Sequence, residues 1–414
     1  MWRAIQARQQ GWFAAVLVLA VLVQLPTFAA RPAASYRALE LGASGAELGA
    51  VVAAYAVLSL VCAVPVGWCV DRWGERPFLV VGAVLVAASA FALGRVGSLP
   101  TLAVALALLG LGHLIATVGM QTLVAKRSGS RKAAAYFGYF TVAVSLGQLA
   151  GPLLLSLLAG GGPAELPQTG QAAGIPQVHT GPVFAAAGAF GLGAVVCALV
   201  PASSRTRDAP RDQADGDARQ PSIGRAGLHV LQLPNMPQAM LVSFGVIASV
   251  DVLVAYLPAY GESAGLSART VGFLLATRAA AALASRLFMG FAVRRVGLAQ
   301  LLFASTASSA AALGLVPLMQ GIVPLLLALM AVAGLGLGLG QPLTLAWVAR
   351  TVPTQIKSTA IAVRLTGNRA GQVTVPAAVG ALTGWVGPGA MFVVLAVLLT
   401  ASALASVRGP NSYE

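Results

Sequence analysis

Residues 67–76 read Gly67-Trp-Cys-Val-Asp71-Arg72-Trp-Gly74-Glu75-Arg76, a short charged turn between two long apolar runs. The pattern returns 223 residues later, at positions 290–297, as Gly290-x-x-x-Arg294-Arg295-x-Gly297. Three more matches follow in the same order at an offset of 224: Gly110-Leu-Gly112 with Gly334-Leu-Gly336, Lys126 with Arg350, and Gly147-Gln148-x-x-Gly151-Pro152 with Gly371-Gln372-x-x-Val375-Pro376. Four matches at nearly one spacing predict that the chain consists of two related halves.

The composition excludes a soluble or a disordered protein. Of the 414 residues 58% are hydrophobic and only 9% are charged, whereas a soluble domain has about 25% charged residues. Long apolar runs in lipid form helices, because every backbone polar group needs an internal partner, and these runs are too long for barrel strands. We expect spans at 11–30, 46–69, 77–94, 100–124, 133–158, 181–201, 236–258, 268–292, 297–317, 321–348, 356–384 and 387–407. The prediction is an all-α membrane protein, with 12 transmembrane helices in two pseudo-symmetric six-helix bundles.

The charges divide the chain and orient it. Residues 202–233 form a polar, charged segment, so we expect an N-terminal bundle at 1–201, a cytoplasmic linker at 202–233 and a C-terminal bundle at 234–414. With the N-terminus inside, 18 of the 26 Lys and Arg residues fall in cytoplasmic segments. Four fall in outer loops, at Arg31, Arg37, Arg95 and Arg269. This asymmetry predicts a multi-pass protein of the bacterial inner membrane with both termini in the cytoplasm.

Other classes of function lack a signal in the sequence. The net charge is +14, but the basic residues stand singly or in pairs between apolar runs, which does not indicate nucleic-acid binding. None of the three cysteines forms a CxxC pair, and there is no Walker loop, metal-ligand cluster or nucleophile elbow. We therefore expect no enzyme activity, no metal and no cofactor. The expected partners are lipid, a small-molecule substrate and protons as the coupling ion, with the chain acting as a monomer.

The turn at 67–76 resembles the signature loop between helices 2 and 3 of the major facilitator superfamily. Glu75 departs from that pattern, which usually has a basic residue there. The repeat, the twelve spans and the central linker extend the resemblance over nearly the whole chain. It implies a secondary transporter that works by alternating access, with its substrate site between the halves near mid-membrane.

The same turn suggests a cytoplasmic gate formed by Gly67, Asp71, Arg72, Gly74 and Arg76. Gly67 would allow close approach of helices. Asp71 would meet Arg72, Arg76 or the positive N-terminal end of a neighbouring helix, and so close one face. The alternative is a turn whose solvated charges only fix topology.

Two further segments carry the resemblance. Gly147-x-x-x-Gly151-Pro152 in helix 5 is similar to the antiporter motif of the superfamily, although leucines follow the proline. Leu106 stands where proton-coupled drug exporters carry an arginine. Residues 31–39 and 364–372 resemble a large, mostly uncharacterised bacterial branch, which implies no particular substrate.

Charged groups inside spans are candidates for function, because each costs about 2.5–3.5 kcal/mol to insert. Asp251 is the only acid deep in a predicted span and is the leading candidate for a proton carrier. Arg278 in the next helix lies at a similar depth, so we expect the two to pair. A static ion pair is the alternative. His113 is the only histidine in a span; it is a proton-relay candidate or simply bridges two helices.

A polar stripe on helix 11 predicts a substrate cavity. Arg364, Asn368 and Gln372 follow one another at i, i+4 and i+8, and the repeat places Gln372 opposite Gln148. Their side chains would suit a polar or anionic group, although Arg364 has the alternative of bonding backbone carbonyls. Arg369 points about 140° away from Arg364 and needs other partners. Gln24 is a weaker candidate for the same cavity.

These observations leave three hypotheses. The first is proton-coupled export, an antiport, with Asp251 as the coupling acid. The second is proton-coupled uptake or exchange of a small organic anion, with Arg364 and Arg278 as the binding charges. The third is a membrane sensor that transports nothing, which the intact turn at 67–76 disfavours.

Overall fold

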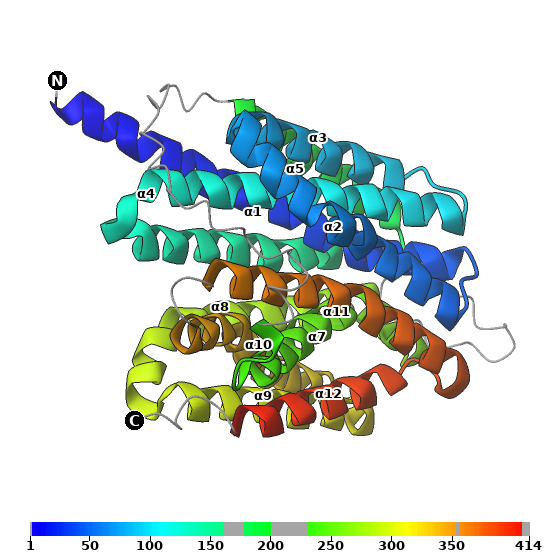
Figure 1. The fold of residues 1–414 in the computed structure, drawn as a ribbon. Coiled ribbons are helices and arrows are strands. Elements are labelled where there is room, and N and C mark those ends of the chain that lie inside the picture. The colour runs from blue at the N-terminus through cyan, green and yellow to red at the C-terminus, as the bar shows by residue number, and fades with distance from the viewer. Residues whose placement is uncertain (1, 160–177, 200–229, 353–356, 408–414) are drawn as a thin grey trace, which may run out of the picture.

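The computed structural model describes residues 2–159, 178–199, 230–352 and 357–407. Its helices are α1 (Trp2–Glu40), α2 (Gly45–Trp73), α3 (Glu75–Leu93), α4 (Leu99–Leu158), α5 (Thr180–Leu199), α7 (Met236–Ser263), α8 (Ala268–Val296), α9 (Leu298–Leu315), the 3-10 turn η1 (Val316–Met319), α10 (Val323–Thr351), α11 (Lys357–Val386) and α12 (Ala390–Val407). Figure 1 shows two bundles side by side, α1–α5 and α7–α12. Most of the predicted linker at 202–233 lies outside the described residues.

The predicted spans are present, with two changes of boundary. Eleven described helical segments are long and apolar enough to cross a membrane. The twelfth is α11, whose polar residues lower its hydropathy. We expected the first span to end at residue 30, but α1 continues to Glu40 through Pro32. The fourth and fifth spans belong to one helix, α4, as Leu99–Ser128 and Ala135–Leu158.

Glycine contacts inside the bundles follow the sequence repeat. A methyl group added to Gly110 of α4 would collide with the Tyr55 carbonyl oxygen of α2, and one added to Gly334 of α10 would collide with the Arg278 carbonyl oxygen of α8. Gly110 and Gly334 are 224 residues apart, and Tyr55 and Arg278 are 223 apart. The sequence repeat therefore corresponds to a repeat in packing. In each bundle a glycine, which has no side chain, allows close contact between the same two helices of the repeat, α4 with α2 and α10 with α8.

The contact between the bundles has the same twofold relation. A methyl group on Gly49 of α2 would lie 3.2 Å from the Pro376 carbonyl oxygen of α11, and one on Gly272 of α8 would lie 2.8 Å from the Pro152 carbonyl oxygen of α4. Gly49 and Gly272 are equivalent in the repeat, as are Pro152 and Pro376. The two bundles thus meet through two equivalent helix crossings, as a pseudo-twofold axis along the membrane normal requires.

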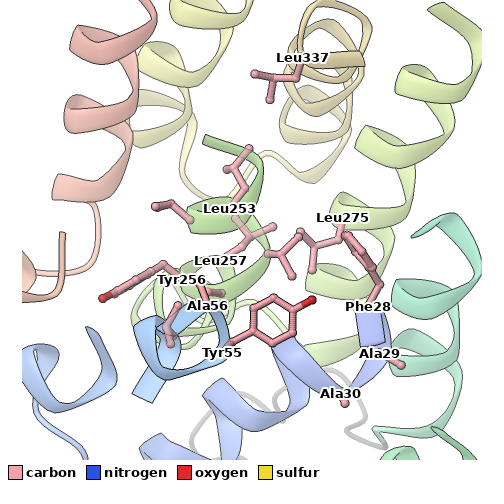
Figure 2. Close-up of a cluster of buried hydrophobic side chains, with 14 of the residues drawn as sticks. Phe28, Ala29, Ala30, Tyr55, Ala56, Leu253, Tyr256, Leu257, Leu275 and Leu337 are labelled. Carbon is pink, nitrogen blue, oxygen red and sulfur yellow. The ribbon is translucent and has the colours of Figure 1, made fainter. Parts of the chain in front are cut away.

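These crossings lie on the side of the molecule away from both termini, which we call the distal side. Figure 1 shows the two termini at one end and the start of α2 with the end of α11 at the other. There, a methyl group on Gly45 would lie 2.8 Å from the Gly384 backbone nitrogen. Figure 2 shows a buried cluster in which side chains of α1 and α2 gather with those of α7 and α8, including Phe28, Tyr55 and Leu257. The distal half of the interface is therefore closely packed.

Glycine at position 110 has a testable energetic role. Gly110→Ala should lower the stability of the protein, because its methyl group would have to displace the Tyr55 carbonyl, and overpacking of this kind typically costs about 1–3 kcal/mol. Gly138 of α4 has nothing within 4 Å of the added methyl, so Gly138→Ala should be neutral or slightly stabilising. Thermal unfolding of the two purified variants tests this, and equal midpoints would contradict the packing described.

Candidate functional site

A buried ion pair joins the two bundles. Arg31 Nη1 of α1 lies 2.5 Å from Asp251 Oδ1 of α7, and the two side chains are 6% and 3% exposed. At 1.5 Å per residue, Arg31 lies about 14 Å and Asp251 about 18 Å from the distal ends of their helices. We expected Arg31 in an outer loop and Arg278 as the partner of Asp251. The structure differs on both points, because α1 does not end before Arg31.

The second carboxylate oxygen of Asp251 is also occupied. Gln372 Nε2 of α11 donates to Asp251 Oδ2 at 2.5 Å, and Gln372 Oε1 accepts from Arg369 Nη1 at 3.0 Å. Charge-assisted bonds of this kind are stronger than those between neutral groups. Gln372 thus holds the carboxylate in place while its amide oxygen contacts a second guanidinium.

The polar contacts continue into the N-terminal bundle. The guanidinium carbon of Arg31 lies 4.3 Å from the centre of the Tyr55 ring, a cation–π distance. The Tyr55 hydroxyl lies 2.9 Å from His113 Nδ1 of α4, while His113 Nε2 is buried and has no hydrogen-bond partner among the described residues. A chain of polar contacts therefore runs from α4 through α2, α1 and α7 to α11, and we call it the central polar chain.

Arg278 lies at a similar depth in α8 and has no salt-bridge partner among the described residues. Its side chain is buried, at 3% exposure, and its Nε and Nη2 atoms make no hydrogen bond to any described residue. The predicted Asp251–Arg278 pair is thus replaced by a nearby, unpaired guanidinium.

Three of the four side chains predicted to line one cavity, those of Arg364, Asn368 and Gln372, make hydrogen bonds within the C-terminal bundle. Arg364 Nη2 donates to Thr344 Oγ1 at 2.9 Å, and to the Gln341 carbonyl oxygen and Oε1 of α10. Asn368 bonds Gln341 and Ser243, while Gln372 turns to Asp251 instead. Arg364 therefore ties α11 to α10 inside its own bundle, which was the structural alternative.

The other cavity candidates pack against neighbouring helices. Gln24 is buried at 3% exposure and lies against Gly147. Gln148 is half-buried, and no hydrogen bond of its side chain occurs among the described residues. Gly147 and Gly151 bring α4 close to α1: a methyl on Gly151 would lie 2.7 Å from the Phe28 carbonyl carbon. The Gly147–Gly151 motif of α4 thus packs against α1, the helix that carries Arg31.

Arg286 fills a gap that proline leaves in α10. Pro342 has no N–H to donate to the Gly338 carbonyl, and Arg286 Nε donates to that oxygen at 3.1 Å. Arg286 Nη1 also donates to Ser145 Oγ of the other bundle at 2.6 Å. This arginine therefore supports α10 and adds a second polar contact between the bundles.

The turn at 67–76 makes its described ion pairs within one bundle. Lys126 Nζ of α4 lies 2.8 Å from Glu75 Oε1 and 3.9 Å from Asp71 Oδ1, whose side chain is 73% exposed. We expected Asp71 to meet Arg72, Arg76 or the N-terminal end of a neighbouring helix; its described ion pair is with Lys126 instead. Gly67 was expected at a close helix approach, but an added methyl there would have nothing within 4 Å. Among the described residues, the ion pairs of the predicted gate therefore stay within the N-terminal bundle.

The glycine of that turn has a clear backbone role. Gly74 has φ +82°, and its repeat equivalent Gly297 has φ +87°. Each N–H caps the preceding helix by donating to Val70 or Val293. Positive φ favours glycine, which explains why both halves carry one here.

Arg31 is the site residue that sequence reasoning missed. The signal was present: a lone buried acid needs a cation, and Arg31 stands in a segment that was singled out only by its resemblance. The predicted first span ended at residue 30, which placed Arg31 in an outer loop. The helix continues through Pro32, and a proline inside a membrane helix is tolerated where neighbouring groups satisfy the freed carbonyl.

The comparisons with known proteins agree with this architecture. The sequence model of the Major Facilitator Superfamily matches residues 16–273 and 239–412. No curated protein matches the chain significantly. Similar solved structures include the nucleoside transporter NupG (13% identity, TM-score 0.71, 96% of this chain and 98% of that chain) and a D-xylose-proton symporter (17%, 0.72, 95% and 96%).

A third similar structure is a bacterial homolog to the human lysosomal transporter Spinster, in an inward-facing and occupied conformation. It is 15% identical, with a TM-score of 0.68, and the match covers 96% of this chain and 93% of that chain. Identities this low show a shared fold alone. Because the family's sequence model spans nearly the whole chain, this protein belongs to the major facilitator superfamily and is a multi-pass membrane transporter rather than an enzyme.

Proposed function

We propose that the protein is a secondary active transporter that exports a small molecule in exchange for protons, with Asp251 as the coupling acid. This proposal rests on the Arg31–Asp251 pair. Of the ion pairs between described residues, it is the one that joins the two bundles. A buried carboxylate whose partner belongs to the other bundle is affected by any motion of one bundle against the other. Protonation and bundle motion are therefore linked at this pair.

The sign of that link follows from charge. Ionised Asp251 attracts Arg31 and so favours contact between the bundles in the distal half, where they are also closely packed. Protonation removes the attraction and leaves only the cost of a buried, unpaired guanidinium. Proton binding therefore favours opening of the distal side, and proton release favours its closure.

We assign the distal side to the cell exterior. The Lys and Arg asymmetry puts both termini in the cytoplasm of the inner membrane. The described conformation is then closed toward the exterior in its distal half. Export is the proposed direction because the Gly147–Pro152 motif, which lies in α4, resembles that of antiporters.

Inside-out membrane vesicles test both coupling and direction. With an interior acidified by respiration and a fluorescent pH-gradient probe, a panel of small organic anions, cations and neutral molecules is added in turn. An exported substrate should dissipate the gradient only in vesicles that contain the protein. Co-uptake of protons and substrate in right-side-out vesicles would contradict export. A gradient that no compound changes in either orientation would contradict proton coupling.

A further inference from the structure

The strongest unexplained feature of the interior is the guanidinium of Arg278. A buried charge is costly unless it is paired and hydrogen-bonded. Arg278 is 3% exposed, yet Nε and Nη2 have no hydrogen-bond partner in the described part of the chain. These two nitrogens form one edge of the planar guanidinium, the edge that binds both oxygens of a carboxylate or phosphate side by side.

The acid nearest in depth does not compensate this charge. Both oxygens of Asp251 are occupied, one by Arg31 and the other by Gln372. Arg369, bonded to Gln372, adds a third guanidinium to the central polar chain. The chain and Arg278 together thus bring three arginines to one carboxylate, so the layer between the bundles carries an excess of positive charge.

The repeat shows that the charge at position 278 is not needed for packing. Its equivalent in the N-terminal bundle is the neutral Tyr55, and both positions accept the same close glycine contact through their backbone carbonyls. The packing position thus tolerates a neutral side chain. The arginine adds two free donors and a charge at the level of the proposed coupling pair.

We propose that Arg278 binds an anionic group of the transported substrate, so that the substrates are small organic anions bearing a carboxylate or a phosphate. This inference rests on the proposed function, because it places the substrate between the bundles beside Asp251. It also suggests how the ion pair opens without a proton. An anion bound at Arg278 competes with Asp251 for the neighbouring Arg31, and a carboxylate freed in this way takes up a proton after the substrate leaves.

Equilibrium binding to the purified full-length protein in lipid nanodiscs tests the inference. Benzoate and succinate are compared with their uncharged amides, benzamide and succinamide, and inorganic phosphate is a separate arm that distinguishes phosphate from carboxylate recognition. At least one anion should bind and its neutral counterpart should not. Arg278→Gln should weaken that binding roughly 10- to 100-fold, the value of a charge-assisted hydrogen-bond pair.

Two further variants make the result decisive. Arg278→Lys keeps the charge without the fork, so it should retain the preference for anions at reduced affinity. Arg269→Gln, which removes an exposed arginine of the same helix, should bind like the wild type. Equal binding of the amides, anion binding that survives Arg278→Gln, or no binding by any anion would overturn the inference. No pH gradient is involved, so this outcome is independent of the test of proton coupling.

Discussion

Inside-out vesicles that carry Asp251→Asn should show no substrate-driven change in the pH gradient, a signal equal to that of vesicles without the protein. The amide has the shape of the carboxylate and can still accept from Gln372, but it cannot release a proton. Asp251 is 2% exposed and is the carboxylate that pairs with Arg31 among the described residues, so its amide leaves this ion pair without a group that can carry the proton. Fluorescence of the pH-gradient probe measures the loss.

The same chemical change at an exposed acid is the control. Asp71 is 73% exposed and lies 3.9 Å from Lys126, so Asp71→Asn should keep the proton-linked signal of the wild type. If Asp251→Asn retained that signal, the carboxylate would be a structural ion-pair partner and the coupling proposal would be wrong.

The second large effect concerns the partner. Arg31→Gln should destabilise the protein by about 3–5 kcal/mol, the usual cost of removing one member of a buried ion pair. The loss arises because Asp251 would remain buried with Gln372 as its only described partner. Chemical or thermal unfolding of the purified protein at neutral pH measures the change.

A double variant separates this effect from general damage to the fold. Arg31→Gln combined with Asp251→Asn leaves no unpaired charge in the pair, so it should recover most of the lost stability. Glu40→Gln is the matched control: Glu40 is about one-third exposed, at 30%, and pairs with Arg37, which keeps its bonds to the Val96 carbonyl oxygen. Such surface pairs contribute only about 0–1 kcal/mol. Additive effects of the two buried changes, with no recovery, would show that the pair does not act as a unit.

The sequence predicted the fold because its signals are local or periodic. Apolar length locates the spans, and the offset between Gly110 and Gly334 predicts equivalent helices, which the glycine contacts then show. Helix ends were less predictable. Pro32 is a stop signal in a soluble helix, but α1 passes through it, as a membrane helix can where neighbouring groups satisfy the freed backbone.

The sequence predicted several residues of the candidate site, but it did not predict which residues they bond. Spacing along α11 places Arg364 and Gln372 on one face and turns Arg369 about 140° away from Arg364, but Arg369 still bonds Gln372, three residues further on. The spacing does not say which helix each meets. Gln372 reaches Asp251 of α7, whereas Arg364 reaches α10. Such pairings depend on how the bundles pack, and no pattern within one helix contains that information.

The central claim is that protonation of Asp251 opens the distal side of the molecule and closes the side of the termini. Spin labels at Ala46 and Trp385 report on the distal side, and labels at Trp73 and Val296 report on the side of the termini. All four positions are exposed. The native cysteines that would also take the label are replaced by serine: Cys62, Cys69 and Cys197.

Distances between these labels in lipid nanodiscs, measured by pulsed electron paramagnetic resonance as the pH is lowered, test the claim most directly. The distal pair should move apart and the other pair should approach each other, and Asp251→Asn should show the low-pH distances at every pH. Distances that do not change with pH, or two pairs that lengthen together, would contradict the account.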